Sequence, residues 1–270
     1  MTPSDAVNDE VLFRVDGAIA TITLNRPDSA NALRPEGRNR IIELLDECDG
    51  RADVRAIVLR AEGRHFCAGA DAGGIRAGQA GERRTGDAIR LLMSGSQRLI
   101  SSVLDCGKPV IAEVQGTAAG LGAHLAFACD LVVAAQEASF IESMLLRGIV
   151  LDAVGAYLLP RRVGLQKAKE LALLGDTLPA AEAAALGLVN RVVPRDDLRA
   201  TVTELAERLA AGPTSAIALT KRLLNLSLDQ DRASALLAEA MAQEVQMTAT
   251  DATEGVAAFI ERRPPDYLGR

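Results

Sequence analysis

Short strand-like segments alternate with helical segments from residue 12 to about residue 193, and this order limits the possible folds more than any other feature. Asp16-Gly17 is a strong two-residue hairpin signal between the first two of these segments. The predicted strands are 12–15, 18–24, 55–60, 109–115 and 131–134, and helices are predicted at 34–48, at 86–104 and around His124. Strands and helices in this order predict a layered α/β domain with crossover connections.

The pattern changes near residue 197, where helix-forming residues replace the strands. The sequence therefore predicts two parts, a core domain at 1–196 and a helical C-terminal region at 197–270. Asp251 and Glu254 have the spacing of a capped helix start. A stripe of apolar residues recurs every four positions and predicts a helix face that is buried against the core domain or another subunit: Leu237, Met241 and Val245.

The composition argues against several functions. The net charge is -6 and only 3% of the residues are aromatic, so nucleic acid is not expected as a partner, because phosphate binding needs a basic excess or a basic stripe. The apolar-leaning stretch 110–133 is interrupted by polar residues, so no membrane span is expected. The four cysteines have no CxxC pair or zinc-ligand spacing, and the first ten residues lack a signal-peptide pattern. These features predict a cytoplasmic protein with reduced thiols and no metal.

Three segments rich in glycine and alanine carry the chemistry. They are 25–33, with Asn25-Arg26-Pro27 and Asn31-Ala32-Leu33; 63–71, which reads Gly-Arg-His-Phe-Cys-Ala-Gly-Ala-Asp; and 108–130, with Gly-Thr-Ala-Ala-Gly-Leu-Gly at 116–122. An oxyanion on a reacting carbonyl group is stabilised by N–H donors that are already in place. Backbone donors can approach such an oxygen only where the side chains are small, and glycine also permits the φ angles that tight loops require.

In this order and spacing, the three segments resemble the crotonase (enoyl-CoA hydratase/isomerase) superfamily, and the resemblance runs from about residue 12 to residue 267. It implies a spiral of ββα units with a helical C-terminal region that builds trimers, often paired into hexamers. The implied substrate is an acyl-CoA thioester, with coenzyme A as part of the substrate and no permanently bound cofactor. The implied oxyanion donors are the backbone N–H groups of Ala70 and Leu121.

The resemblance also implies a set of coenzyme A contacts. Arg26 is expected near the phosphates, and an arginine there also suits bidentate phosphate binding. The other expected contacts are Ser29, Ala30 and Ala32 along the pantetheine and adenine, Ala68 and Asp71 around the nucleotide, and Arg262 at a subunit boundary. Asp28 stands where many relatives carry a basic residue. Cys67 is expected to pack rather than to act as a nucleophile, because the sequence places no base beside it.

The two carboxylates that hydratases of this family place over the substrate are absent from their positions. His124 and Met144 stand there instead, and methionine cannot transfer a proton. Asp152 matches a position that is acidic in several isomerases and dehalogenases of the superfamily. His124 in its neutral form could accept a proton near pH 7. If 140–144 is extended, Glu142 shares a face with Met144 and could replace its carboxylate.

Three hypotheses follow. The first is an acyl-CoA isomerase or related lyase in which Asp152, assisted by His124, moves a proton between carbons of a thioester enolate. The second is an enoyl-CoA hydratase that uses His124 with Glu142 or Asp152, in fatty-acid or related acyl-CoA breakdown. The third is an acyl-CoA-binding subunit without catalysis.

Overall fold

A six-stranded sheet forms the centre of the molecule in the computed structural model, which describes residues 10–71, 73 and 84–270. The strand order is β1-β2-β3-β4-β6-β9; β1 and β2 are antiparallel and the other neighbours are parallel. The strands are β1 (Val11–Asp16), β2 (Ile19–Leu24), β3 (Ala56–Ala61), β4 (Val110–Val114), β6 (Leu131–Ala135) and β9 (Arg191–Val193). Asp16 pairs with Ile19 across the turn, so the predicted hairpin is confirmed.

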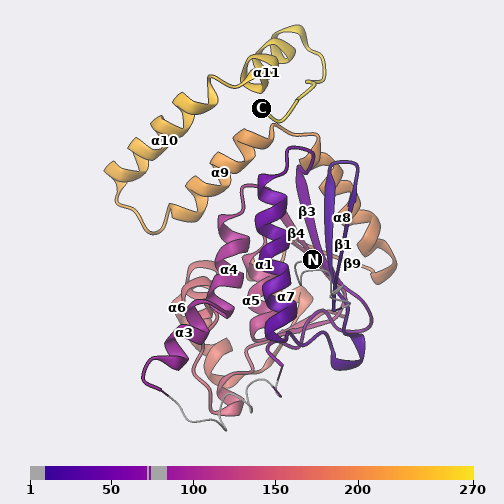
Figure 1. Cartoon of the computed structure of the whole chain (residues 1–270), viewed down its shortest axis with the longest axis vertical. Helices are drawn as coiled ribbons and strands as arrows, with labels where there is room; N and C mark the ends of the chain where they lie inside the picture. Colours follow the sequence, from indigo (N-terminus) through magenta and orange to yellow (C-terminus); the bar gives the residue numbers. More distant parts are fainter. Residues whose placement is uncertain (1–9, 72, 74–83) are drawn as a thin grey trace, which may run out of the picture.

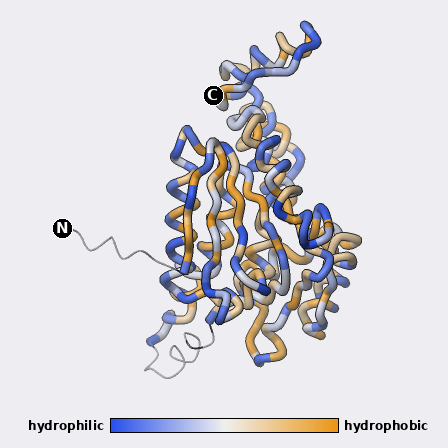
Figure 2. The backbone as a smooth tube through the Cα atoms, turned by 90° about the vertical axis from the view of Figure 1, so that its right-hand side faces the viewer, coloured by the Kyte–Doolittle hydropathy of each residue, from blue (hydrophilic) through white to orange (hydrophobic). Residues whose placement is uncertain are grey.

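Helices cover both faces of this sheet (Figure 1). The larger core lies on the side of α1 (Pro35–Gly50), α4 (Ser96–Asp105) and α5 (Leu121–Ala128), and α8 (Arg195–Ala210) covers the opposite face. Alternate residues of a strand point to opposite faces, so Ile57 and Leu59 join the larger core while Val58 packs toward α8. Figure 2 shows the resulting apolar strands at the centre of the molecule. The α/β class predicted from the sequence is confirmed.

A smaller three-stranded sheet follows the carboxyl end of β4. It consists of β5 (Thr117–Ala119), β7 (Ser139–Ile141) and β8 (Thr177–Pro179), with β5 parallel to β7. In the described part of the chain, the remaining helices outside the C-terminal region are α3 (Asp87–Met93), α6 (Gly155–Leu174), α7 (Ala180–Ala185) and the short η1 (Pro27–Ser29) and η2 (Leu145–Arg147). Because β5 leads directly into α5, this sheet fixes the start of α5 beside the strand ends of the main sheet.

The single helix predicted at 86–104 is wrong, because the chain bends between α3 and α4. Gly95 has φ of -109° and ψ of -105°, which are not helical. A side chain there would collide with two groups, since a Cβ would lie 2.3 Å from the carbonyl oxygen of Leu91 and 2.5 Å from Nη1 of Arg38. The apolar spacing continues across the break, and it therefore gives no sign of the bend.

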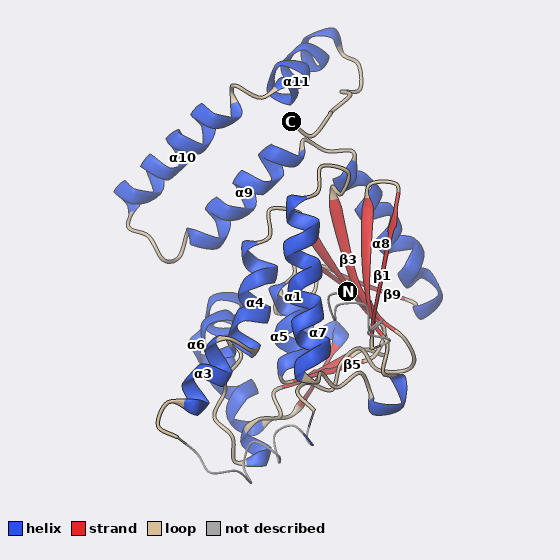
Figure 3. Ribbon diagram, in the orientation of Figure 1, coloured by secondary structure: helices blue, strands red, loops and turns tan. Residues whose placement is uncertain are grey.

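Three helices, α9 (Thr214–Leu226), α10 (Arg232–Gln246) and α11 (Thr250–Glu261), extend away from the sheet as an arm (Figure 3). The predicted helical C-terminal region is thus present, and the predicted boundary between residues 196 and 197 falls within α8. None of the described helices combines the length and apolar character needed to cross a bilayer.

The predicted cap at Asp251 is wrong. The residue before α11 is Ala249, and Asp251 is buried inside the first turn, where its carboxylate accepts hydrogen bonds from the backbone N–H groups of Leu268 and Gly269 at 2.7 and 2.8 Å. The carboxylate therefore binds the C-terminal segment of the chain and does not cap the start of the helix.

Candidate functional site

Two buried amide side chains hold the loop that follows β3. Nδ2 of Asn31 donates to the backbone oxygens of Glu62 and His65, both at 2.8 Å. Nε2 of Gln115 donates to the backbone oxygens of Ala61 and His65, both at 3.0 Å. These bonds fix the segment 63–71 relative to β4. Sequence reasoning missed both roles; the only signal was that Asn31 belongs to a quoted motif and that Gln115 is a polar residue at the end of a buried strand.

The second and third glycine-rich segments lie in backbone contact. A Cβ on Gly69 would be 2.7 Å from the carbonyl oxygen of Ala119 and 3.5 Å from the backbone nitrogen of Leu121. A Cβ on Gly122 would be 2.2 Å from the carbonyl oxygen of Cys67. Only glycine fits at these two positions, so the packing explains the composition of the loops. The contacts also bring the backbone beside Ala70 close to the first turn of α5.

The backbone N–H groups of Ala70 and Leu121 have no hydrogen-bond acceptor in the part of the chain that the structure describes. Leu33 donates to the oxygen of Gly69 and accepts from the N–H of Asp71, a parallel bridge that leaves the N–H of Ala70 facing away from Leu33. Leu121 is the first residue of α5, where backbone N–H groups lack intrahelical acceptors. Two unused donors on adjacent segments are the elements of an oxyanion hole; their joint binding of a thioester oxygen remains a prediction.

His124 lies one turn into α5 and is completely buried. Its Nε2 is 2.9 Å from Oε2 of Glu142, and both side chains are shielded from solvent. Its Nδ1 is buried and has no hydrogen-bond partner among the described residues. The imidazole also packs tightly against Gly155, where a Cβ would lie 2.2 Å from Cε1 and 2.4 Å from Nε2. The sequence did not predict this histidine–glutamate pair.

The condition under which Glu142 could replace the missing carboxylate, an extended segment over 140–144, is not met. Strand β7 ends at Ile141, and η2 begins directly after Met144. Glu142 therefore does not share a strand face with Met144, and its carboxylate contacts His124 instead. The side chain of Met144 packs on the turn before α5, because its Cε would be 3.4 Å from a Cβ on Gly120.

Asp152 lies near His124, at the start of α6. Gly155, which contacts the imidazole, donates its backbone N–H to the carbonyl oxygen of Asp152 at 2.8 Å. Burial raises the pKa of the Asp152 carboxyl above its ordinary value, and the proximity of His124 opposes this rise. Asp152 opens onto a pocket of about 500 Å³ lined by Gln97, Ser101, Leu104, Asp105, Leu151, Asp152, Val154, Ala156 and Tyr157. A half-buried carboxyl with a raised pKa beside a pocket suits a general base.

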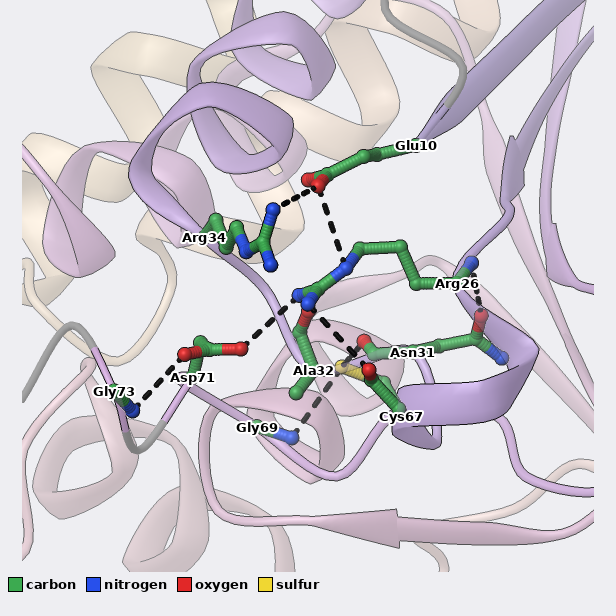
Figure 4. Close-up of polar contacts among 10 residues, drawn as sticks. Glu10, Arg26, Asn31, Ala32, Arg34, Cys67, Gly69, Asp71 and Gly73 are labelled. Carbon is green, nitrogen blue, oxygen red and sulfur yellow. Dashed lines mark hydrogen bonds and ion pairs between the residues drawn. The ribbon is translucent and has the colours of Figure 1, made fainter.

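Six of the seven predicted coenzyme A contacts come together around the first glycine-rich segment. The guanidinium of Arg26 contacts Oε1 of Glu10 at 3.3 Å, Oδ2 of Asp71 at 3.2 Å and the carbonyl oxygen of Ala32 at 2.5 Å (Figure 4). Its Nη2 also lies 3.5 Å from Oγ of Ser29. The N–H of Ala68 donates to the oxygen of Ala30, whose φ of 49° turns the chain back toward this loop.

Arg262 does not join this group. It is exposed and directly follows α11 on the arm, at the opposite end of the molecule from the segment 26–32 (Figure 1). Among the described residues, no hydrogen bond or ion pair is found between Arg262 and the other six predicted contacts. A role for Arg262 at a subunit boundary stays a prediction.

Cys67 is enclosed between these loops. It is buried, its Sγ donates to the oxygen of Asn31 at 3.2 Å, and burial raises the pKa of its thiol to about 12. Such a thiol stays protonated at neutral pH and is a poor nucleophile. In the described residues, no three His, Cys, Asp or Glu side chains converge as a set of metal ligands.

Comparison with known proteins gives a consistent set of relatives. The family model for enoyl-CoA hydratase/isomerase matches residues 14–270. A Rhodobacter capsulatus protein named "Probable enoyl-CoA hydratase" is 36% identical over 96% of this chain and 98% of its own length. The 1,2-epoxyphenylacetyl-CoA isomerase of Escherichia coli is 34% identical over 96% of this chain and 98% of its own. A solved Streptomyces coelicolor structure, named for enoyl-CoA hydratase, superposes with a TM-score of 0.92 at 38% identity, covering 100% of this chain and 98% of that one.

Proposed function

Because the chain belongs to the crotonase (enoyl-CoA hydratase/isomerase) superfamily, we propose that it isomerises an enoyl-CoA thioester by moving a proton between two carbon atoms. One observation carries this proposal. Asp152 is a half-buried carboxyl with a raised pKa at a pocket, whereas the two hydratase carboxylate positions hold His124 and Met144. A 1,3 proton shift needs a single well-placed base.

In the proposed reaction, the Asp152 carboxylate removes a proton from carbon 2 of a 3-enoyl thioester. The electron pair spreads onto the thioester oxygen, where the N–H groups of Ala70 and Leu121 stabilise the enolate. Losing one such donor typically costs about 3 kcal/mol of transition-state stabilisation. The Asp152 carboxylic acid then returns the proton to carbon 4, which leaves a 2-enoyl thioester and the original carboxylate. The proposed reaction consumes no water and uses no cofactor.

Coenzyme A is proposed to lie along the loops that carry Arg26, Ser29, Ala30, Ala32, Ala68 and Asp71, with Arg262 supplied by a second subunit. The support is that contacts join these residues to one another, and that Ala68 and Asp71 belong to the same loop as Ala70. A homotrimer or hexamer is part of the same proposal. Exposed apolar side chains on the arm support it: Leu237, Met241, Val245, Phe259 and Ile260.

Hydration of an enoyl-CoA ester is the second candidate. The His124–Glu142 pair favours it, because a carboxylate-linked imidazole could activate a water molecule. Heavy-oxygen water separates the two reactions by product mass. Hydration adds one labelled oxygen, whereas isomerisation leaves the mass of the thioester unchanged.

The test is a screen of 3-enoyl and 2-enoyl thioesters with the wild-type chain and the Asp152→Ala variant. We expect the wild type to convert 3-enoyl to 2-enoyl thioesters and Asp152→Ala to lose turnover while its acyl-CoA affinity is nearly unchanged. Asp105→Asn is the matched control, because Asp105 is an exposed carboxylate that lines the same pocket. Full turnover in Asp152→Ala would remove Asp152 from the mechanism, and binding without turnover in the wild type would support a non-catalytic subunit.

A further inference from the structure

We propose that Arg195, together with Gln115, is a positioning residue of the oxyanion hole, and that the two side chains hold the loop that carries Ala70 against the segment that leads to Leu121. This inference rests on the proposed function, in which the backbone N–H groups of Ala70 and Leu121 stabilise the enolate. Neither side chain contacts the substrate in this role, and both act through the backbone.

The amide of Gln115 is the first part of the arrangement. Gln115 directly follows β4 and is buried. Its Nε2 donates to the carbonyl oxygens of Ala61 and His65 at 3.0 Å and to that of Gly63 at 3.3 Å. A glutamine side chain donates only through its NH₂ group, so the amide nitrogen must face these carbonyl oxygens. The side chain therefore binds the end of β3 and the start of the loop 63–71.

The main chain of Gln115 continues into the other segment. Strand β5 follows after Gly116 and leads into α5, whose first residue is Leu121. A Cβ on Gly116 would lie 2.0 Å from the carbonyl oxygen of Arg64, so the two segments are in backbone contact there. The side chain of Gln115 thus holds the loop of Ala70, while its main chain begins the path to the second donor.

Arg195 joins the same two segments from the far side of the sheet. It is the first residue of α8, which covers the face opposite the larger core (Figure 1). Its Nη1 donates to the carbonyl oxygen of Gln115 at 3.2 Å, and its Nη2 donates to that of Gly63 at 3.3 Å. The N–H groups of a guanidinium form a rigid planar fork. The two carbonyl oxygens that the fork bridges are therefore held at a set separation.

Gly63 is the point at which the two side chains meet. Its carbonyl oxygen accepts from Gln115 and from Arg195. A Cβ on Gly63 would be 2.7 Å from Cβ of Pro27, so the chain here is already in close contact with the first glycine-rich segment. Loss of Arg195 would therefore loosen the base of the loop while the two oxyanion donors stay chemically unchanged.

Amide hydrogen exchange tests the inference without substrate. The N–H of Cys67 donates to the oxygen of Thr117 at 3.2 Å, and the N–H of Ala119 donates to the oxygen of Cys67 at 2.8 Å. The exchange rates of these two N–H groups report the contact between the segments. We expect Arg195→Ala to raise both rates about tenfold, because it removes two hydrogen bonds that hold the segments together. Exchange in α1 should stay as in the wild type.

Arg208→Ala is the matched control, because Arg208 is an exposed arginine in the last turn of the same helix. It should leave both exchange rates and turnover unchanged. Gln115→Met removes the buried amide with little change in size, and it should raise the same rates more than Arg195→Ala because it removes three hydrogen bonds. Arg195 is exposed, so its variant keeps the test valid if Gln115→Met does not fold.

Turnover distinguishes positioning from a purely structural role. Misaligned donors weaken binding of the enolate more than binding of the substrate, so kcat and kcat/KM should fall together. We expect Arg195→Ala to lower kcat about tenfold, less than the loss of a whole oxyanion donor, with KM nearly unchanged. Guanidinium ion at millimolar concentration should restore part of the kcat of Arg195→Ala and should not change that of Arg208→Ala.

Unchanged exchange at Cys67 and Ala119 in Arg195→Ala would overturn the inference. So would an unchanged kcat in that variant, or a rise in exchange that is equal in every part of the chain. The exchange measurement needs no substrate, so failure of the proposed function is seen separately, as a wild-type chain that shows the expected exchange pattern but does not isomerise any enoyl thioester.

Discussion

The ammonium group of Lys221 lies 2.8 Å from Oδ2 of Asp130 and joins the first helix of the arm to the core domain. Lys221 is on α9 and is buried, and its Nζ also donates to the carbonyl oxygen of Val103 at 2.9 Å. Asp130 lies between α5 and β6, where Oδ2 also accepts the N–H of Val110 at 2.7 Å. The helix α9 is therefore fixed to the same strands that carry the candidate site.

Replacing Lys221 with Met should destabilise the whole chain. It leaves the largely buried Asp130 carboxylate without its cation, and removal of one partner of a buried pair typically costs about 3–5 kcal/mol. Asp130 is partly exposed to solvent, so we expect the lower end of this range, a loss of about 3 kcal/mol in the free energy of unfolding, measured with urea. Lys167→Met is the matched control, because Lys167 pairs with Glu170 at the surface, and such pairs contribute at most about 1 kcal/mol. Equal losses in the two variants would contradict this account of Lys221.

Gly122→Ala should lower the activity strongly while the helix content of the protein stays nearly unchanged. Its new methyl group would lie 2.2 Å from the oxygen and 2.7 Å from the Cβ of Cys67. The loop 63–71 must move to accept it, which separates Ala70 from Leu121. We expect at least about a hundredfold loss of kcat/KM, as for removal of one oxyanion donor. Gly50→Ala, where no atom lies within 4 Å of the new Cβ, should keep full activity; a similar loss there would refute the steric explanation.

Local sequence patterns predicted the parts of the fold that depend on neighbouring residues. The Asp16-Gly17 turn, the buried strands and the glycine-rich loops follow from φ angles, alternation and close backbone contact, which a few consecutive residues encode. The missed features depend on distant residues. Arg38 from α1 packs against Gly95, where the chain leaves the helical conformation although the apolar spacing is continuous. The carboxylate of Asp251 accepts hydrogen bonds from the N–H groups of Leu268 and Gly269, although its spacing from Glu254 in the sequence is typical of a helix cap.

In the candidate site too, neighbouring residues encode some features and distant residues determine others. The positions of Ala70 and Leu121 follow from motif spacing, whereas the contact of His124 with Glu142 depends on the parallel pairing of β5 with β7, in which Thr117 lies opposite Ser139. That pairing places the residue after β7 beside the first turns of α5. No spacing along the chain encodes it. The conditional argument from an extended 140–144 therefore paired Glu142 with Met144, whereas its partner in the structure is His124.

The arm offers a direct test of the proposed assembly. Leu237, Met241 and Val245 are each more than 60% exposed in the single chain, which is unusual for a continuous apolar helix face. We expect the wild type to be a trimer or hexamer by light scattering and Met241→Glu to shift it to smaller species, because a charge would be buried without a partner. Gln243→Glu adds the same charge two residues away and should leave the assembly intact. A monomeric wild type would rule out this interface.

The pH dependence of turnover tests Asp152 as the base. Only the carboxylate can remove a proton, so kcat/KM, which reports the groups of the free enzyme, must fall as the pH falls through the pKa of Asp152. Burial raises that pKa, and the midpoint of the acidic limb should therefore lie above the ordinary aspartate value of about 3.9. Asp105→Asn should keep this limb, while Asp152→Asn should lose turnover at every pH.

The raised pKa of Asp152 also predicts the thermal stability of the Asp152→Asn variant. A carboxyl with a raised pKa in the folded state binds its proton more tightly there than in the unfolded chain. Its contribution to stability is therefore present below the unfolded pKa and is lost as the pH rises through the folded pKa. At neutral pH the ionised Asp152 destabilises the fold, so Asp152→Asn should melt at the same temperature as the wild type or higher, although it is inactive. A lower melting temperature would mean that Asp152 supports the fold, and its loss of activity would then be no evidence for a catalytic carboxylate.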